Sequence, residues 1–336
     1  MNESSKIRII MFKWFIGDGR TGGDKYFISV TEMLSKRFNV ELKECFPIKF
    51  EGHPRLFSII SIPVSIICAN INTFKLLKNG YQVCSLYYSG SIYIVAPPIY
   101  NDLAFRFKIL FKYYAIVDYI SRFGKNNIKL VIYISEYVRS KYKFKKQGIK
   151  EYVVYPSVID KIPKTEFSEK ENIIVTVSRI ATEKKLEKLI TITENLPYKH
   201  YLIGFSTDKP YTEKLKLLLK NTTLILDASE EVKNNYLRRA KIFLNTSENE
   251  PFGLVLIEAM SHGAIPIAHN SGGPKEILPE NFLYSNEDDA KALIIKYMTN
   301  YNENIFNELR EKAKNFTKEK VEHELYEAVF STFSNS

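Results

Sequence analysis

The sequence predicts an α/β protein built from two doubly wound, Rossmann-like domains with parallel sheets. Short apolar segments typical of buried strands alternate with helical segments along the chain, and this alternation favours parallel sheets covered by helices. The 336 residues are enough for two domains of ordinary size. A hydrophobic fraction of 45% indicates a globular chain rather than a disordered one.

In the first half of the chain, apolar segments with the length of strands are separated by segments typical of helices. The expected strands are 6–16, 40–42, 82–87, 91–95, 129–135 and 151–155. The expected helices are 24–37, 54–77, 102–123 and 136–146. The segment 156–167 has two prolines, several charges and little periodicity, so it is expected to link the two domains.

The second half repeats the alternation more clearly. The expected strands are 172–178, 200–204, 223–226 and 241–247. The expected helices are 184–195, 210–220, 230–239, one that begins at about Gly253, and a last one at 318–333. Ligands of doubly wound domains gather at the carboxyl ends of the strands, so we expect the active site there.

The helix expected from Gly253 contains a single carboxylate, Glu258, among apolar neighbours. Such a helix should be buried on most sides, and a buried carboxylate is costly unless it is hydrogen-bonded, so Glu258 needs a polar partner. The first amides of the helix suit a phosphate, and Gly253 lets a ligand come close. Glu250 lies at the mouth of the preceding turn, where it could bind a sugar. The alternative is an ordinary buried helix.

Two glycine pairs precede expected helices. Gly22 and Gly23 follow the first strand and have the form of a turn that offers bare amides to a phosphate, although a plain turn is the alternative. Gly272 and Gly273 precede Pro274, which is favoured at the first position of a helix. Both pairs would allow a ligand to approach the backbone closely.

The segment from Glu250 to Glu276, EPFGLVLIEAMSHGAIPIAHNSGGPKE, resembles the donor-binding motif of retaining GT-B glycosyltransferases of family four, the glycosyl transferases group 1. The resemblance rests on two glutamates with seven residues between them, combined with EPFG, EAM and SGGP in register. The part AHNSGGPKE is similar to mannosyltransferases that build lipid-linked oligosaccharides. Glu276 stands where members of the family often have a glutamate. An exposed residue in the first turn of a helix is an equally good interpretation of Glu276.

The resemblance implies the GT-B fold, in which two Rossmann-like domains face a central cleft. It assigns 1–160 to an N-terminal acceptor-binding domain and 161–316 to a C-terminal domain that binds the nucleotide-sugar donor. The remaining segment, 317–336, would be the C-terminal helix that packs back on the first domain.

The resemblance also implies roles for individual residues. Glu258 would hold the ribose, Glu250 the sugar, and Arg179 and Lys184 the diphosphate, because fixed cations stabilise the negative charge that develops on the leaving group. Lys185 competes for the role of Lys184, and a solvated pair at a helix start is the alternative. The expected catalytic residues are Arg179, Lys184 and Glu250. The expected donor-binding residues are Gly22, Gly23, Arg179, Lys184, Glu250, Phe252, Gly253, Leu254, Glu258, Gly272 and Gly273.

The expected activity is retaining transfer of mannose or another hexose from a GDP- or UDP-linked donor to a hydroxyl of a glycan or lipid-linked acceptor. No DxD motif stands in a convincing loop, so we expect no metal and no cofactor besides the nucleotide sugar. One departure is that 91–101 lacks the histidine that many members place near the reacting sugar, and His53 is expected to be a loop residue. The alternative is therefore a catalytically inactive GT-B binding or scaffold subunit. A GT-B epimerase or phosphorylase would need other site residues.

The net charge of +10 would suit nucleic acid, an anionic membrane or a phosphorylated substrate. The basic residues are scattered without a recognisable nucleic-acid module, so we expect no nucleic-acid partner. The apolar segment 57–71 contains a proline and is shorter than the about 20 residues of a membrane span. It is either a core helix or an interfacial patch near a lipid acceptor.

The location expected from the sequence is cytoplasmic, with peripheral association at the inner face of an anionic membrane as the further expectation. The cysteines Cys45, Cys68 and Cys84 have no metal-ligand spacing and form no disulfide framework. The apolar run 9–16 is interrupted by Lys13, unlike a signal peptide.

Overall fold

A computed structural model describes residues 7–13, 22–44, 67–85, 90–95, 123–141, 144 and 146–334. The chain divides into two compact units. The first consists of Met1–Tyr155 together with Val321–Ser336, and the second of Pro156–Lys320. The assignment of 1–160 to the acceptor and 161–316 to the donor stays a prediction.

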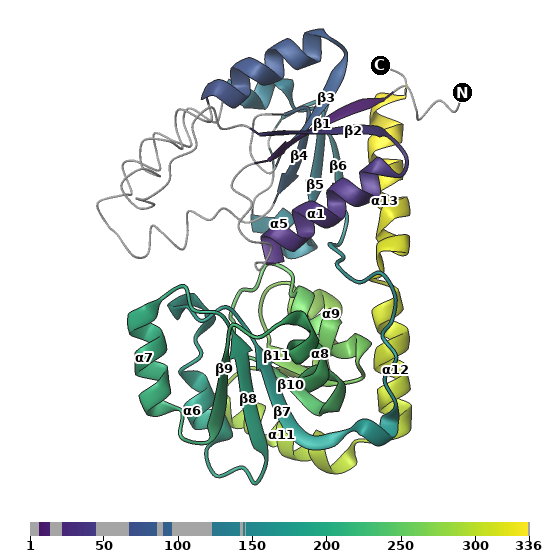
Figure 1. Cartoon of the computed structure of the whole chain (residues 1–336). Coiled ribbons are helices and arrows are strands. Elements are labelled where there is room, and N and C mark those ends of the chain that lie inside the picture. Colours follow the sequence, from purple (N-terminus) through teal and green to yellow (C-terminus); the bar gives the residue numbers. More distant parts are fainter. Residues whose placement is uncertain are drawn as a thin grey trace. The chain divides into compact units, whose positions relative to one another are not determined.

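The first unit contains a parallel six-stranded sheet in the order β2-β1-β3-β4-β5-β6 (Figure 1). Its strands are β1 (Arg8–Lys13), β2 (Asn39–Glu44), β3 (Tyr81–Ser85), β4 (Ile92–Val95), β5 (Leu130–Tyr133) and β6 (Lys150–Val153). Its helices are α1 (Gly22–Ser35), a helix at 67–78, the 3₁₀ turn at Phe123–Asn127 and α5 (Glu136–Lys141). All residues of β4 and β5 are buried, as expected for central strands covered on both faces.

The C-terminal helix α13 (Lys318–Phe333) covers the range expected from the sequence, and its residues from Val321 onward belong to the first unit. Its Glu322 carboxylate accepts from Lys36 Nζ at 2.6 Å and from Arg37 Nε at 3.3 Å. One turn further along the helix, the ring of Tyr326 stacks on Phe38 with 5.5 Å between centroids. These contacts fasten α13 to the segment between α1 and β2.

The second unit contains a parallel six-stranded sheet in the order β12-β11-β10-β7-β8-β9. Its strands are β7 (Glu171–Val177), β8 (Lys199–Gly204), β9 (Thr222–Leu226), β10 (Ala240–Asn245), β11 (Ile265–His269) and β12 (Leu283–Tyr284). The order reverses between β7 and β10, and this reversal marks the point where doubly wound sheets bind ligands.

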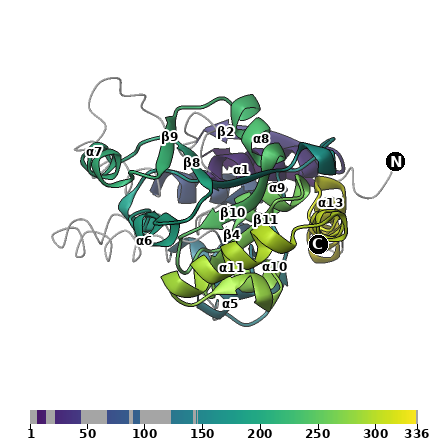
Figure 2. The ribbon, with the colours of Figure 1, turned by 90° about the horizontal axis from the view of Figure 1, so that it is seen from below.

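Helices cover both faces of the second sheet. They are α6 (Lys188–Thr193), α7 (Lys209–Leu218), α8 (Glu230–Arg239), α9 (Leu254–Ser261), α10 (Pro274–Ile277), α11 (Glu287–Asn300) and α12 (Glu303–Lys314). Figure 2 shows α8 and α9 on one side of the sheet and α6 and α11 on the other. Short 3₁₀ turns lie at Phe167–Glu169, Thr182–Lys184 and Glu280–Phe282.

Side-chain caps explain where several of these helices begin. Asp208, Ser229, Asn286 and Asn302 each accept a hydrogen bond from the amide three residues further on. Such caps satisfy amides that have no acceptor within the helix. The helix predicted at 230–239 has both its ends correct.

The structure confirms the predicted α/β class with two doubly wound sheets. The expected start of a helix at 184 is wrong, because a 3₁₀ turn ends at Lys184 and Lys185 is left-handed, with φ of 50°. Helix α6 therefore begins only at Lys188. Residues 102–122 of the predicted helix 102–123 lie outside the described part of the chain. Most of the predicted helix 54–77 and His53 lie outside it as well.

Candidate functional site

The candidate site of the second unit lies at the carboxyl ends of β7 and β10. These strands are neighbours, with Phe243 opposite Val175. The chain leaves β7 into the loop that carries Arg179 and Lys184, and it leaves β10 into the loop that carries Glu250. Topology thus brings together three residues that are up to 71 positions apart in the sequence.

Lys184 and Glu250 form an ion pair at the centre of this site. The distance from Lys184 Nζ to Glu250 Oε2 is 2.6 Å, and both side chains are largely buried, with 22% and 19% exposed. Thr246 Oγ1 also donates a hydrogen bond to Lys184 O at 2.8 Å, which ties the two loops together. The structure thus brings Lys184 and Glu250, both expected donor-binding residues, into direct contact.

The electrostatics of Glu250 are dominated by its cationic neighbours. Burial acts to raise the pKa of this carboxyl, but Lys184, Ser247 and Arg179 together lower it by more, so that the pKa lies below its usual value. Arg179 itself pairs with Glu183 at 2.5 Å. Glu250 is therefore an anion paired with Lys184 and further stabilised by the charge of Arg179.

The turn that leads into α9 shows why a glycine is required there. Gly253 has φ of +112° and precedes Leu254, the first residue of the helix. A Cβ atom at Gly253 would lie only 2.7 Å from Leu256 Cδ1. The amides of the first turn have no acceptor within the helix, and they carry the positive end of its dipole.

Glu258 has the polar partner that its apolar surroundings demanded. Lys233 Nζ lies 2.7 Å from Glu258 Oε2 and 2.7 Å from Glu230 Oε2. The lysine side chain is only 9% exposed. Burial acts to lower the pKa of Lys233, but the two glutamates raise it above its usual value, so the lysine stays charged. Lys233, which comes from α8, was not predicted from the sequence.

A cavity of 360 Å³ opens beside Glu258 within the second unit. It is lined by Val158, Ile159, Asp160, Lys161, Pro163, Glu230, Lys233, Asn234, Glu258, Ser261 and His262. Most of these side chains are polar, so the cavity suits a ligand with several hydroxyl groups.

Gly272 and Gly273 have a different surrounding from the one expected of a ligand-facing loop. Added Cβ atoms would lie 2.4 Å from Glu250 O and 2.5 Å from Phe252 Cα. Gly273 N also donates to Glu250 O at 2.8 Å. The close approach that these glycines allow is therefore that of the backbone around Glu250, and this packing explains both glycines.

Gly22 and Gly23 lie in the first turn of α1, which begins two residues before the predicted start at 24. Their amides are thus first-turn amides of a helix rather than part of a loop before it. The residues 14–21 that precede them lie outside the described part of the chain.

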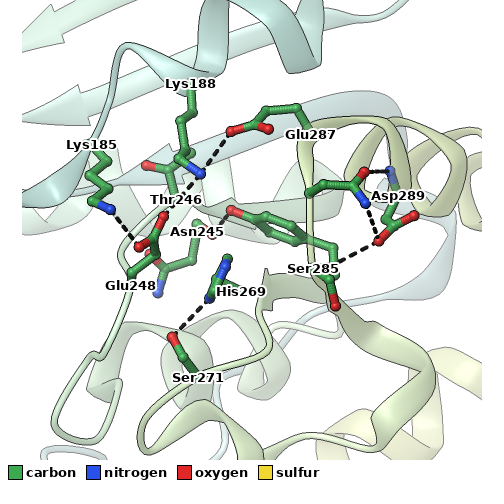
Figure 3. Close-up of polar contacts among 12 residues, drawn as sticks. Lys185, Lys188, Asn245, Thr246, Glu248, His269, Ser271, Ser285, Glu287 and Asp289 are labelled. Atoms are coloured by element: carbon green, nitrogen blue, oxygen red, sulfur yellow. Dashed lines mark hydrogen bonds and ion pairs between the residues drawn. The ribbon is translucent and has the colours of Figure 1, made fainter.

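A network of charged residues beside the site was not found from the sequence (Figure 3). Glu248 pairs with both Lys185 and Lys188, and Lys188 continues to Glu287. Nearby, His269 Nδ1 and Ser271 Oγ are 2.8 Å apart. The spacing of two lysines three residues apart was visible, but their partners lie far away in the sequence.

Within the described residues, no group of three or more His, Cys, Asp or Glu side chains is arranged to hold a metal ion. Nor does any helix of the described part combine the length and apolarity that crossing a membrane requires.

Comparisons with known proteins agree with the two-unit architecture. A solved structure of sucrose-phosphate synthase from Thermosynechococcus elongatus superposes with a TM-score of 0.77, covering 98% of this chain and 100% of that chain at 15% sequence identity. This likeness shows the fold, the GT-B arrangement of two Rossmann-like domains in one chain. Residues 158–320 match the family model described as glycosyl transferases group 1, so this region of the chain is similar to that family.

Two curated relatives share parts of the chain. Sulfoquinovosyl transferase SQD2 of Arabidopsis thaliana is 32% identical over 136 residues, which are 38% of this chain and 26% of the relative. GDP-Man:Man(3)GlcNAc(2)-PP-Dol alpha-1,2-mannosyltransferase of Dictyostelium discoideum is 27% identical over 245 residues, 60% of this chain and 48% of the relative. The matched regions thus make up from a quarter to about half of the length of these relatives. The predicted resemblance to the family is confirmed.

Proposed function

We propose that this protein is a retaining, metal-independent hexosyltransferase that moves a sugar from a nucleoside diphosphate donor to an acceptor hydroxyl. The observation that carries the proposal is the Lys184–Glu250 pair at the carboxyl ends of β7 and β10. It stands where doubly wound sheets bind ligands, in the region that matches the family.

Each donor-site residue is assigned to one part of the nucleotide sugar. Arg179 and Lys184 face the diphosphate, Glu250 binds hydroxyls of the sugar, and Glu258 binds the ribose beside the 360 Å³ cavity. The amide of Leu254 adds the positive end of α9. Arg179 and Lys184 are each paired with a glutamate, so a bound diphosphate would have to share or replace these partners.

The reaction replaces one bond at the anomeric carbon. The bond from this carbon to the diphosphate oxygen breaks, the acceptor oxygen bonds to the same face, and the acceptor proton goes to the departing phosphate. Because charge accumulates on the leaving diphosphate, Arg179 and Lys184 stabilise the transition state more than the ground state. Gly22 and Gly23, at the start of α1, would supply further amides.

The donor is proposed to be linked to GDP or UDP, and the sugar to be mannose or another hexose. The Dictyostelium relative is named for a GDP-Man donor and a PP-Dol acceptor, which supports mannose and a lipid-linked or glycan acceptor. No cofactor besides the nucleotide sugar is part of the proposal, and neither is nucleic acid.

A cytoplasmic location with peripheral binding to an anionic membrane is proposed from one face of the helix at 67–78. Ile67, Ile71 and Phe74 recur on this face and are 44%, 53% and 55% exposed. Lys78 Nζ lies 4.6 Å from the centroid of the Phe74 ring. Co-sedimentation with phosphatidylglycerol vesicles should fall with added salt and with Phe74→Ser, while phosphatidylcholine vesicles should capture little protein.

The activity is tested by thermal shift and initial transfer rates with GDP-mannose, UDP-glucose and UDP-GlcNAc, each with and without EDTA. Stabilisation by one nucleotide series that survives EDTA and is lost in Lys184→Met, but not in the exposed-site control Lys220→Met, is expected. Binding without transfer to any acceptor would favour the alternative, a catalytically inactive GT-B scaffold. No binding at all would contradict the proposed donor site.

A further inference from the structure

Two adjacent lysines in the turn after β7 face two glutamates, separated by Asn249, in the loop after β10. They form two parallel ion pairs, Lys184 with Glu250 and Lys185 with Glu248. The second pair is part of a longer chain of ion pairs. Glu248 Oε1 also lies 3.0 Å from Lys188 Nζ, and this nitrogen lies 2.7 Å from Glu287 Oε1. We call the four residues of this extension the Glu248 network, namely Lys185, Glu248, Lys188 and Glu287 (Figure 3).

The Glu248 network joins three elements of the second unit. Lys188 is the first residue of α6, and Glu287 is the first residue of α11. Glu248 lies in the loop after β10 and uses both its carboxylate oxygens on lysines. The hydrogen bond from Lys185, together with one from Lys188, lowers the pKa of Glu248 to about 2 against the effect of burial. Glu248 is therefore ionised throughout the ordinary pH range.

The backbone beside each donor-site residue is left-handed. Lys185 follows Lys184 and has φ of 50°, and Asn249 precedes Glu250 and has φ of 52°. Side chains other than glycine rarely adopt this conformation, so neighbouring contacts must hold it. At Lys185 the contacts are the hydrogen bond from its amide to Thr182 O at 3.1 Å and the salt bridge to Glu248, and at Asn249 the amide donates to Ser271 Oγ at 2.8 Å.

The two ion pairs differ in their electrostatic surroundings. Arg179 contributes to the lowered pKa of Glu250, whereas the cations that lower the pKa of Glu248 are Lys185 and Lys188. The carboxylate of the first pair therefore also interacts electrostatically with Arg179, the arginine proposed to bind the diphosphate. The second pair is directed toward α6 and α11.

We propose that the Glu248 network is a positioning device that holds Lys184 opposite Glu250 and does not itself contact the donor. This inference rests on the proposed function, since it takes Lys184 and Glu250 as donor-site residues. It assigns the diphosphate contact to Lys184 and a positioning role to Lys185, the two residues between which the sequence left a choice.

The test compares Lys185→Met, Glu248→Gln and the double variant in the full chain. Donor affinity is measured by calorimetry with GDP and UDP, and kcat and KM are measured with the active nucleotide sugar. Glu280→Gln, an exposed glutamate on the same unit, is the matched control. A positioning role predicts that both single variants and the double variant lose kcat alike, by about tenfold, because misplacement of a reacting group by about 1 Å costs up to about 100-fold.

A second comparison separates positioning from general destabilisation. In a Lys184→Met background, Glu248→Gln should cause no further loss of kcat, because the residue to be positioned is gone. Glu287→Gln, at the far end of the network, should cause a smaller loss in the same direction. A Glu248→Gln loss that persists undiminished in the Lys184→Met background would overturn the proposal.

The opposite assignment has its own signature. If Lys185 were the diphosphate ligand, Lys185→Met would weaken nucleotide binding, whereas Glu248→Gln would free the lysine and leave binding equal or tighter. That result would overturn the positioning role, as would wild-type kinetics in all variants. Failure of the proposed function is distinguishable, because the unaltered protein would then neither bind nor transfer a nucleotide sugar.

Discussion

Glu250 and Glu258 are separated by seven residues in one turn and helix, and each is paired with a lysine, yet they are held in different ways. The partner of Glu250 comes from a loop after a strand, and the loop of Glu250 is fastened by Ser271, Gly273 and the neighbouring Glu248. Glu258 projects from a helix, and its partner Lys233 projects from another.

The two carboxylates differ in what orients them. A carboxylate on a helix is oriented by the helix itself and needs only a counter-ion, whereas a carboxylate on a loop depends on a surrounding set of contacts. We therefore expect changes at Glu250 to affect the chemical step, and changes at Glu258 to affect binding of the donor.

The largest effect is expected from Glu250→Gln, which keeps the size of the side chain but removes its charge beside Lys184. Glu250 orients Lys184, which acts on the developing charge of the leaving diphosphate, and loss of such a charged group typically costs about 10²–10³ in kcat. Single-turnover rates at saturating donor should show this loss with little change in thermal stability. Full activity in the variant would contradict a role in the chemical step.

Glu258→Gln is expected to raise KM for the donor by about tenfold to 100-fold, since a hydrogen bond to a charged group contributes about 1.5–3 kcal/mol. Its kcat should fall far less than that of Glu250→Gln, because ribose binding is similar in ground and transition states. Steady-state kinetics of the two variants side by side provides the measurement. Equal losses of kcat would remove the distinction between the two glutamates.

Gly272→Ala should lower stability by about 3 kcal/mol, because it combines a positive φ of 71° with a Cβ placed 2.4 Å from Glu250 O. Gly148→Ala is the matched control, since φ there is 75° and no atom lies within 4 Å of the added Cβ. That variant should lose about 1 kcal/mol. Thermal melting measures both, and only Gly272→Ala should also lower kcat by displacing Glu250. Equal melting temperatures of the two variants would refute the role of close packing.

The sequence predicted the elements whose signals are local. The segment 230–239 carries Ser229 as a cap and a regular pattern, and the strands at 200–204 and 223–226 are short apolar runs. The strands β11 and β12 were missed because one contains a proline and the other has only two residues. The helices α11 and α12 were also missed, although the capping residues Asn286 and Asn302 could have indicated them.

The sequence indicated single residues of the candidate site but not the residues with which they pair. The need for a polar group at Glu258 followed from its apolar neighbours, but Lys233 lies 25 positions earlier on another helix. The two glycines of the 271–274 loop signal a close approach without saying what approaches, and only the fold shows that it is the chain at Glu250. Pairings of this kind depend on strand order, which periodicity does not reveal.

The smallest effect concerns acid stability near Glu258. His262 caps the same helix, is buried, and lies 3.2 Å from Thr165 Oγ1 through Nδ1. Burial, with Lys170 and Lys233 nearby, lowers its pKa to about 3. Below pH 6.5, the ordinary pKa of histidine being about 6.5, His262 binds a proton in the unfolded chain but not in the folded one. The contribution of His262 to the free energy of unfolding is therefore complete above pH 6.5 and is lost as the pH falls toward 3.

For this histidine the cost of moving from pH 7 to pH 5.5 is about 1 kcal/mol. His262→Gln cannot take up the proton in either state, so the gap in melting temperature between the native protein and the variant should narrow over this range. His200, whose pKa burial also lowers to about 3, destabilises both proteins equally and cancels in the comparison. A gap that stays constant from pH 7 to pH 5.5 would mean that His262 can be protonated in the folded protein. The surroundings of Glu258 would then be more open to water than their burial indicates.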